Sequence, residues 1–354
     1  MVKWNLIRIF HNKTNQTRVE RKRNIIFVKR IFIVFGIFLG AWTKGVSQDP
    51  QFSQFYANQL YLAPSFAGAT EENRISLNHR NQWPALPGVF LTYSFSADRY
   101  FSNFNSGVGL IALHDRAGSG RLSNTIVGLL YSYNIQLNES WHIRPGVNFM
   151  YTRLGIDFNR LVFNDQLSPG GTTPQTEPPP FDSKPDIDFS SSILAYTERI
   201  WIGSTVDHLL KPNQSLYGEE TIVPIKFSVF GGMQIIKKGR LLNPIDESLS
   251  TAFLFKTQGG YTQLDLGMYW FKEPLVFGVW WRGLPVFKGH FDRDAVILLV
   301  GYKTSNLHIG YSYDLTVSSL ITHTGGAHEI SLVYEFRSNP RRKIKVHAIP
   351  CPEF

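Results

Sequence analysis

The feature that most constrains the fold of this chain is a repeated two-residue alternation of apolar and polar side chains. From Trp141 to Tyr151 the odd positions are mainly apolar and the even positions mainly polar. Similar alternation occurs within 91–96, 307–314 and 330–336. Because successive side chains of a β-strand point to opposite faces, each segment predicts a strand with one apolar and one polar face.

Two architectures use strands of this kind. A transmembrane β-barrel presents its apolar face to lipid and its polar face to the lumen, in segments of about ten residues. A soluble sandwich alternates as well, with its apolar face in the core. After Gln48 there is no run of about 18 apolar residues, which excludes a helical-bundle membrane protein.

The number and spacing of the candidate strands favour the barrel. We predict fourteen strands, an even number as in closed bacterial barrels. They cover residues 73–81, 89–97, 106–114, 123–136, 141–153, 186–195, 199–207, 223–236, 248–256, 260–271, 275–282, 294–302, 307–314 and 327–336. Most connections alternate between short turns, expected in the periplasm, and long loops, expected outside the cell. Two depart from this alternation, because 98–105 is long for a turn and 257–259 is short for a loop.

Tryptophan positions are also typical of a membrane barrel. Every Trp residue after position 47 lies within a few residues of a predicted strand end. These residues are Trp83, Trp141, Trp201, Trp270, Trp280 and Trp281. This placement favours interfacial aromatic girdles, and burial in the core is the alternative for any one of them.

Residues 1–47 are typical of a secretory signal peptide with an extended basic n-region. The basic residues 29–30 precede an apolar run over 31–42. Small residues follow, and we predict cleavage between Ser47 and Gln48. The apolar run is shorter than the roughly 20 residues that a bilayer span needs, which disfavours the alternative of a permanent anchor.

The basic character of the chain is confined to this leader. The whole sequence has a formal net charge of +9, with 36 Lys or Arg and 27 Asp or Glu. Residues 1–47 contain ten of the basic residues and one acidic residue, Glu20, so residues 48–354 carry 26 of each sign. A neutral mature chain gives no support for nucleic-acid binding.

No arrangement of residues predicts catalysis or a metal site. His114 precedes Asp115, and His323 is near His328, but no recognised catalytic spacing accompanies either pair. The one Cys residue is Cys351, which excludes a disulfide within the chain and disfavours a Cys-based metal site. We therefore expect no enzymatic activity, no metal ion and no cofactor.

The order of segments predicts how the mature chain is divided. Residues 73–336 form the predicted barrel, and the basic tail 337–354 is expected in the periplasm. Residues 48–72 precede the first strand and contain five aromatic residues that require burial: Phe52, Phe55, Tyr56, Tyr61 and Phe66. Two locations remain open for this segment, a plug in the barrel lumen or a periplasmic cap.

Several segments, taken in order, resemble one known protein family. They are QDPQFSQFYANQLYLAPSFAGA at 48–69, RNQWP at 80–84, LHDRAG at 113–118, GYSYDLT at 310–316, GAHEISLVYEF at 326–336 and IPCPEF at 349–354. Their combination resembles the PorP/SprF family of the Bacteroidetes. The resemblance implies an outer-membrane barrel of the type IX secretion and gliding-motility machinery in a Gram-negative bacterium.

The resemblance also implies a function in protein export. Members of this family are associated with export of particular cargo proteins and with cell-surface anchoring of adhesins such as SprB through a C-terminal sorting domain. The implied partners are such cargo, other type IX secretion components and outer-membrane lipid. Residues near the predicted outer loops are the candidates for partner contact: Asn81, Gln82, Trp83, Asp115, Arg116, Asp314 and His328.

A second function class remains open from the residues alone. Barrels of about eight strands are filled by side chains, whereas barrels of about sixteen or more leave a channel, so an intermediate barrel can be plugged or open. An open lumen would predict a passive channel or small-solute transporter. A plugged lumen favours docking of secreted proteins at the outer loops.

Overall fold

The computed structural model describes residues 49–336, apart from gaps at 71–72, 87, 89, 159–160, 162–181, 217–219, 240–246, 284–294 and 318–323. The predicted signal peptide with its cleavage site, the predicted tail 337–354 and His323 lie outside the described residues. Within the described part, no helix is both long and apolar enough to cross a membrane.

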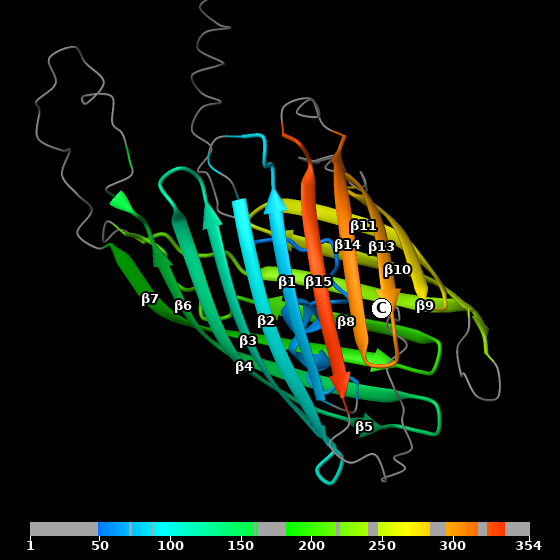
Figure 1. Cartoon of the computed structure of the whole chain (residues 1–354). Coiled ribbons are helices and arrows are strands. Elements are labelled where there is room, and N and C mark those ends of the chain that lie inside the picture. The colour runs from blue at the N-terminus through cyan, green and yellow to red at the C-terminus, as the bar shows by residue number, and fades with distance from the viewer. Residues whose placement is uncertain are drawn as a thin grey trace, which may run out of the picture. The chain divides into compact units, whose positions relative to one another are not determined.

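The described chain consists mainly of antiparallel β-strands (Figure 1). Their bounds are β1 (Asn73–Gln82), β2 (Phe90–Phe101), β3 (Ser106–Ala117), β4 (Leu122–Tyr133), β5 (Ile135–Gln136), β6 (His142–Gly155), β7 (Ser183–Tyr196), β8 (Ile200–Asp207), β9 (Lys226–Lys238), β10 (Glu247–Gln258), β11 (Tyr261–Lys272), β12 (Leu275–Arg282), β13 (Ala295–Lys303), β14 (Leu307–Thr316) and β15 (Ala327–Phe336). Neighbouring strands pair, β15 pairs with β1, and both β4 and β5 pair with β6. The described strands therefore form a closed barrel of fourteen strands with one short additional strand, which confirms the predicted all-β barrel.

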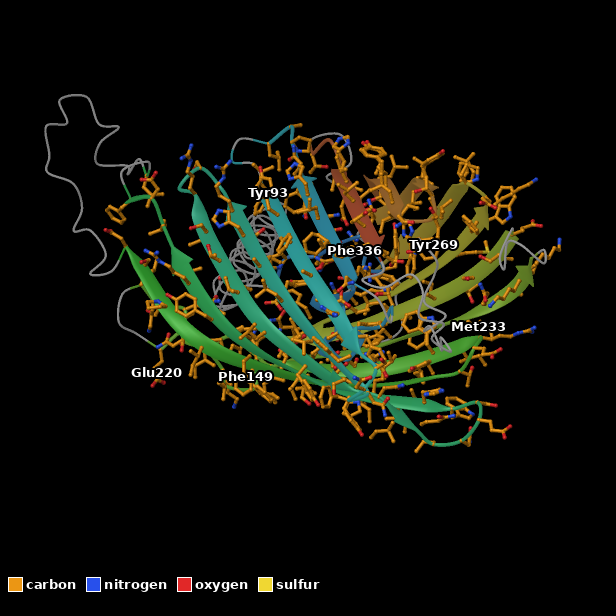
Figure 2. All side chains as sticks on the ribbon, turned by 60° about the horizontal axis from the view of Figure 1, so that its bottom comes forward. Tyr93, Phe149, Glu220, Met233, Tyr269 and Phe336 are labelled. Atoms are coloured by element: carbon orange, nitrogen blue, oxygen red, sulfur yellow. The ribbon has the colours of Figure 1, made fainter. Side chains whose placement is uncertain are left out.

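The two faces of the barrel wall have opposite polarity. On β1, the buried side chains of Arg74 and Ser76 alternate with outward-facing Leu77. Phe149 on β6 projects from the outer face and is 64% exposed (Figure 2), and Ile187 on β7 is equally exposed. An apolar exterior is stable when the surrounding solvent is lipid, whereas a polar interior needs hydrogen-bond partners within the barrel.

The connections differ in length at the two ends of the barrel. One end, which we call the long-loop end, contains the connections 83–89, 156–182, 208–225, 283–294 and 317–326. The other, the short-turn end, contains 102–105, 197–199, 273–274 and 304–306. β2 continues to Phe101, so the turn after it is shorter than predicted. Two connections at the long-loop end are short: 118–121, and Gly259 with Gly260, whose positive φ angles of 57° and 90° favour glycine. At the short-turn end, the connection 239–246 is longer than the turns named above.

Residues 49–70 lie inside the barrel, and we call them the inner segment (Figure 1). They contain a short helix, α2 (Gln59–Leu62), and one 3₁₀ turn, η1 (Pro64–Phe66). The apolar side chains of this segment pack against buried side chains from strands on several sides of the barrel: Ile111, Leu130, Leu194, Trp201, Phe230, Tyr269 and Trp280. The hydrophobic core is therefore built around the inner segment.

The tryptophan residues divide between the two faces of the wall. Trp270 and Trp281 face outward and are 40% and 41% exposed, as expected for an interfacial girdle. Trp201 and Trp280 point inward and are 1% and 2% exposed, so a girdle position is wrong for these two. Both occupy strand positions that face the lumen, where their rings pack against the inner segment.

Candidate functional site

The carboxylate of Glu329, a fully buried residue of β15, binds the beginning of the inner segment. Its Oε2 atom accepts the Ser53 backbone N–H at 2.7 Å, and its Oε1 atom accepts that of Gln54 at 3.0 Å. The Gln54 side chain donates to Ser312 Oγ at 3.1 Å and to the Glu329 carbonyl at 2.9 Å. Both backbone donors would otherwise be buried without partners, so Glu329 offsets part of the cost of placing this segment in the lumen.

Ser53 also contacts a buried cluster of charged side chains on the barrel wall. Its hydroxyl lies 2.7 Å from Asp314 Oδ2, 2.6 Å from Arg80 Nη1 and 2.7 Å from Arg282 Nη2. Asp314 Oδ2 lies 2.8 Å from Arg80 Nη2 and 2.9 Å from Arg282 Nη1. Arg80 also pairs with Glu329 at 3.1 Å. Separating any of these buried ion pairs would be strongly destabilising, so the charged side chains stay together. Ser53 is held because its hydroxyl hydrogen-bonds to several of them.

In the middle of the inner segment, β1 binds backbone carbonyls. Arg74 Nη2 donates to the carbonyls of Tyr56 and Ala57 at 3.0 and 3.1 Å. Ser76 Oγ donates to the same Ala57 carbonyl at 2.7 Å. Arg74 also donates to the side chain of Gln59. The wall thus satisfies buried acceptors just where the segment lacks regular secondary structure.

The last residues of the inner segment, toward the short-turn end, are bound through their backbone as well. Arg144 donates to the carbonyls of Ala67 and Gly68 at 2.5 and 3.2 Å. Ser132 Oγ donates to the Ala67 carbonyl at 2.7 Å. The Gly68 N–H donates to Asp98 Oδ2 at 2.8 Å. Neutral backbone groups therefore carry most of the polar contacts at this end.

Two glycines of the wall allow the inner segment to approach the barrel backbone closely. A Cβ atom at Gly107 would lie 1.9 Å from the Ala67 carbonyl oxygen, and one at Gly146 would lie 2.3 Å from the Ser65 nitrogen. Both distances exclude a side chain, and the obstructing atoms belong to the backbone. Glycine at these two positions therefore fits the wall to the inner segment.

The five aromatic residues of the inner segment lie in the lumen. Four of them are at most 8% exposed: Phe52, Phe55, Tyr56 and Phe66. Tyr61 is partly buried. Phe55 packs edge-to-face on Trp280, and Tyr56 packs edge-to-face on Tyr269, both with ring centroids 4.9 Å apart. Each buried aromatic side chain contributes roughly 1.5–3 kcal/mol of hydrophobic free energy.

At the long-loop end, the inner segment meets a second cluster of charges. Asp49 Oδ2 lies 2.7 Å from Lys226 Nζ and 2.9 Å from His208 Nε2. His208 Nδ1 lies 2.6 Å from Asp188 Oδ2, and Lys226 Nζ lies 3.1 Å from Asp207 Oδ2. The inner segment therefore runs the length of the lumen, from these charges at the long-loop end to Arg144 near the short-turn end.

The charges of this cluster shift two pKa values. Burial alone would raise the pKa of Asp49, but Lys226 and His208 outweigh burial and hold the pKa of that carboxyl well below its usual range. Burial alone would lower the pKa of His208, but Asp49 and Asp188 outweigh burial and raise its pKa to about 10. At neutral pH, Asp49 is therefore ionised and His208 is protonated.

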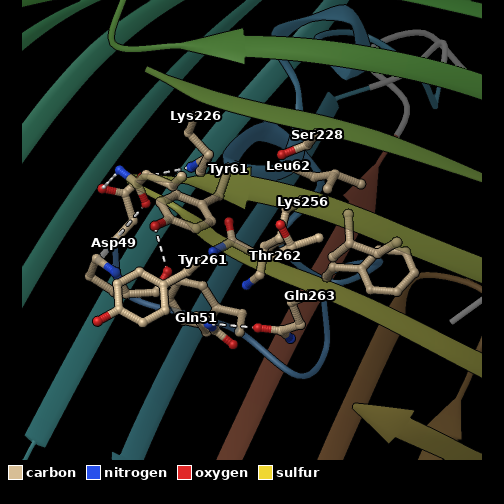
Figure 3. Close-up of a pocket in the computed structure, with 16 residues that line it drawn as sticks. Asp49, Gln51, Tyr61, Leu62, Lys226, Ser228, Lys256, Tyr261, Thr262 and Gln263 are labelled. Carbon is tan, nitrogen blue, oxygen red and sulfur yellow. Dashed lines mark hydrogen bonds and ion pairs between the residues drawn. The ribbon is translucent and has the colours of Figure 1, made fainter. Parts of the chain in front are cut away.

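A small cavity adjoins this cluster, between the inner segment and strands β9 to β11 (Figure 3). Its volume is about 90 Å³. Gln51 Nε2 donates to Gln263 Oε1 at 3.0 Å along its edge, and the Tyr61 hydroxyl donates to the Pro50 carbonyl at 2.6 Å. Pockets for small-molecule ligands measure about 300–1,000 Å³, so this cavity has room for a few water molecules rather than for a larger solute.

Most residues predicted to contact partners lie at the long-loop end. Asn81 and His328 are cross-strand neighbours on the outer face of the wall, where His328 Nδ1 lies 2.8 Å from the Tyr311 hydroxyl. Trp83 follows β1, and its backbone N–H donates to the Gly326 carbonyl at 2.8 Å. These residues lie on the rim of the barrel.

The remaining partner candidates separate by the face on which they lie. Gln82 ends β1, and Arg116 lies on the outer face of β3. Asp115 faces inward and accepts a hydrogen bond from Thr92 Oγ1 at 2.6 Å. Asp314 requires a correction, because it is a lumen-facing residue of β14 that is 2% exposed rather than a residue of an outer loop.

The histidine considered as a base does not face a carboxylate. His114 lies on the outer face of β3, where its Nδ1 atom lies 2.9 Å from Thr125 Oγ1. Asp115 points to the opposite face of the same strand, so the two side chains are not placed as a base and its orienting group. Among the described residues, no group of three or more His, Cys, Asp or Glu side chains is placed to bind a metal ion.

The alternation around Arg144 predicts that this side chain faces the lumen, but the sequence does not predict that wall residues bind the inner segment. Arg80, Arg144, Arg282 and Glu329 are all buried at lumen-facing strand positions. Their charge on the polar face of a strand is a usable signal, because a buried arginine or carboxylate needs a partner. Sequence spacing cannot identify that partner, since Arg80 and Glu329 are 249 positions apart.

Solved structures similar to this chain include three channel proteins. The CymD monoaromatic hydrocarbon channel is 9% identical, with a TM-score of 0.47 and coverage of 79% of this chain and 93% of that one. The P. putida toluene transporter TodX is 9% identical, with a TM-score of 0.46 and coverage of 78% and 93%. The KdgM porin is 9% identical, with a TM-score of 0.36 and coverage of 75% and 99%.

Among curated proteins, no relative matches this chain. The family described as type IX secretion system membrane protein PorP/SprF matches residues 45–334, which include the inner segment and nearly the whole barrel. This match confirms the resemblance seen in the short sequence segments. The chain therefore belongs to the PorP/SprF family and is a β-barrel protein of the bacterial outer membrane.

Proposed function

We propose that this barrel is a non-catalytic component of type IX secretion that serves export, cell-surface anchoring, or both, of specific cargo proteins. The cargo would carry a C-terminal sorting domain, as SprB-like adhesins do. The observation that supports this proposal is the inner segment, which occupies the lumen from Asp49 to Thr70. A barrel with an occupied lumen is poorly suited to passive solute transport, which leaves its rim and loops as the functional surface.

The long-loop end is the proposed contact surface for cargo. Outer-membrane barrels have short periplasmic turns and longer extracellular loops, so this end is expected to face the outside of the cell. Asn81, Trp83 and His328 lie on its rim. The short-turn end would then face the periplasm, where other type IX secretion components are expected.

Surface proteomics of a deletion strain tests the proposed function. Loss of the gene should remove one or a few specific proteins from the cell surface, and the wild-type gene should restore them. Uptake of small solutes should not change. The opposite pattern, an unchanged surface proteome with reduced uptake of a solute, would favour the alternative of a passive channel or small-solute transporter.

Epitope insertion tests the orientation on which the contact surface depends. One epitope is inserted at Thr173, within the connection between β6 and β7, and a matched epitope is inserted at Glu198, in the short turn between β7 and β8. Antibody should label intact cells with the Thr173 insertion and label the Glu198 insertion only after the outer membrane is permeabilised. Labelling of the Glu198 epitope on intact cells would contradict the proposed orientation and place the short-turn end outside the cell.

A further inference from the structure

A crevice of about 440 Å³ lies on the outer face of the barrel at the long-loop end. It is formed by β3, β4, β6 and β7, away from the lumen and the inner segment. Three arginines line it, Arg116, Arg121 and Arg153, together with the carboxylates of Asp157 and Asp182. Such a group of guanidinium side chains on the lipid-facing side of a barrel requires an explanation, because this face meets hydrocarbon over most of its height.

The strand register shows where the crevice lies relative to the apolar wall. Outward-facing residues of these four strands form rows of direct cross-strand neighbours. From the long-loop end downward, the rows are Arg116, Ser123, Gly155 and Ser183; His114, Thr125, Arg153 and Pro185; Ala112, Val127, Tyr151 and Ile187; and Leu110, Leu129, Phe149 and Phe189. The upper two rows carry the polar and basic residues, and the lower two are apolar or aromatic.

The outer face changes from polar to apolar between the second and third of these rows, which are two residues apart along each strand. Ile187, Phe149 and Leu129 in the lower rows are 64%, 64% and 63% exposed, which is the exposure expected of side chains in contact with lipid chains. The crevice lies directly above them. We therefore expect its arginines at the level where lipid headgroups begin, and the acyl chains of the same lipids against the apolar rows.

The interior of the crevice is open because its upper row contains small residues. Ser123, Gly155 and Ser183 lie side by side between Arg116 and the edge of β7. A Cβ atom at Gly155 would find its nearest neighbour at 3.4 Å, so glycine is not required there by a clash. The small side chains instead leave space between the arginines.

One arginine of the crevice is oriented by a neighbour. Ser183 Oγ accepts hydrogen bonds from Arg153 Nη2 at 2.9 Å and from Arg153 Nε at 3.2 Å. A guanidinium group has five N–H donors, so donors remain for a ligand after these two bonds. Fixed guanidinium groups bind phosphate through paired, charge-assisted hydrogen bonds.

We propose that this crevice binds the phosphate of a phosphorylated membrane lipid in the leaflet at the long-loop end. Three arginines against two carboxylates leave an excess of positive charge in the crevice, which favours an anion. The continuity with an exposed apolar wall favours a lipid over an acidic protein segment, because a lipid satisfies both the basic crevice and the rows beneath it. The crevice, to which Arg116 contributes, lies on β3, β4, β6 and β7, whereas the rim residues proposed for cargo contact lie on or beside β1 and β15.

Native mass spectrometry of the purified barrel in neutral detergent tests the proposal. The probes are lipid A that carries phosphate, the same lipid A after removal of phosphate, and inorganic phosphate. The test variant replaces Arg116, Arg121 and Arg153 by Gln. The matched control replaces Lys237, Lys238 and Lys272 by Gln, which removes the same charge near the short-turn end.

The wild-type barrel and the lysine control should retain phosphorylated lipid A and bind the dephosphorylated lipid much more weakly. The arginine variant should lose about a hundredfold in affinity, since each basic residue near an anionic lipid surface contributes roughly a fivefold factor. Equal losses in both variants would overturn the proposal in favour of unspecific charge attraction. Displacement of the lipid by inorganic phosphate at equal concentration would overturn the lipid assignment and indicate a free-phosphate site.

The lipid affinities can be compared only if each variant forms the closed barrel. Heat-modified migration in gel electrophoresis reports the closed barrel, and dephosphorylated lipid A gives a second reference for each variant. A folded arginine variant that binds phosphorylated lipid A as tightly as the wild type would refute the proposed site.

Discussion

The two ends of the inner segment are bound in the barrel by different kinds of contact. At the short-turn end, Gly107 and Gly146 allow backbone to touch backbone, and Arg144 binds neutral carbonyls. At the long-loop end, Asp49 is bound by the charged side chains of His208 and Lys226. One end is therefore fixed mainly by shape, and the other mainly by charge.

The contacts at the short-turn end are also more deeply buried than those at the long-loop end. The Arg144 residue is 1% exposed, whereas the Asp49 side chain is 21% exposed beside a cavity of about 90 Å³. Water and salt reach exposed charges more easily than buried ones, and they weaken ion pairs there. The inner segment is therefore expected to detach first at the long-loop end, whereas its contacts at the short-turn end should respond little to pH or salt.

The largest expected effect comes from filling the close contacts at the short-turn end. The double substitution Gly107→Ala and Gly146→Ala places each new Cβ atom within 1.9 or 2.3 Å of backbone atoms of the inner segment. Overpacking of this kind costs about 1–3 kcal/mol per site, so the temperature of unfolding in detergent should fall clearly. Circular dichroism during heating measures it.

The control for this prediction lies on the same strand as Gly146. In Gly155→Ala the new Cβ atom has its nearest neighbour at 3.4 Å, an ordinary contact. The unfolding temperature of this variant should equal that of the wild type. Equal destabilisation by both kinds of substitution would mean that close contact with the inner segment is not the cause.

A smaller loss is expected when the polar contacts of the same end are removed. Arg144→Met removes the arginine donor from the carbonyls of Ala67 and Gly68, of which the Ala67 carbonyl keeps Ser132 Oγ. An unsatisfied buried acceptor at Gly68 costs about 1–3 kcal/mol. Protease cleavage within the inner segment should become faster. Arg153→Met, an exposed arginine on the same strand, should leave the cleavage rate unchanged, and a similar increase in both variants would argue against a specific role of Arg144.

At the long-loop end, a charge substitution should loosen only the nearby part of the segment. Asp49→Asn removes the negative charge that pairs with His208 and Lys226, which we expect to cost about 1 kcal/mol because the site is partly exposed. Hydrogen exchange should quicken near Ser53 and remain slow near Ala67. Faster exchange along the whole segment would contradict the independence of the two ends.

The smallest expected effect is the pH dependence of the long-loop end. The raised pKa of His208 means that its contribution is complete below its ordinary value of 6.5, and is lost as pH rises through about 10. The lowered pKa of Asp49 means that its contribution is complete above its ordinary value of 3.8, and is lost as pH falls below it. Protection from hydrogen exchange near Asp49 should therefore be greatest between these ordinary values.

Hydrogen exchange at a series of pH values, corrected for the intrinsic rate, measures this dependence. His208→Gln should remove the decrease toward alkaline pH and leave the decrease toward acidic pH. Residues near Ala67 should show little change over the same range. A pH response of equal size at both ends would remove the distinction between an end fixed by shape and an end fixed by charge.

The barrel could be predicted from the sequence because its signal is local. Alternation identifies each strand independently, and even the predicted strand 248–256, which precedes the unusually short connection 257–259, is present as β10. Strand ends are harder to predict from alternation. The sequence predicts a turn that begins at Asp98, whereas β2 continues to Phe101. A charged residue near the end of an apolar pattern is typical of a turn. On this strand, however, Asp98 faces the lumen and accepts a hydrogen bond from the Gly68 N–H.

The candidate site could be predicted only in part. The aromatic residues of 48–72 indicated a segment that needs burial, but a plug and a cap require the same residues. Trp201 and Trp280 lie near strand ends and so resembled girdle residues, yet their strand parity places them in the lumen. Contacts such as those of Ser53 with Arg282 join positions 229 residues apart, and no periodicity encodes such a pairing.

Conductance of the purified barrel in a planar lipid bilayer tests the central claim, that the inner segment closes the lumen, most directly. The account predicts little steady conductance for the wild-type protein at neutral pH. A variant that lacks residues 49–69, if its barrel still forms, should open to ions. Large, steady conductance of the wild-type barrel, equal to that of the deletion variant, would contradict the account.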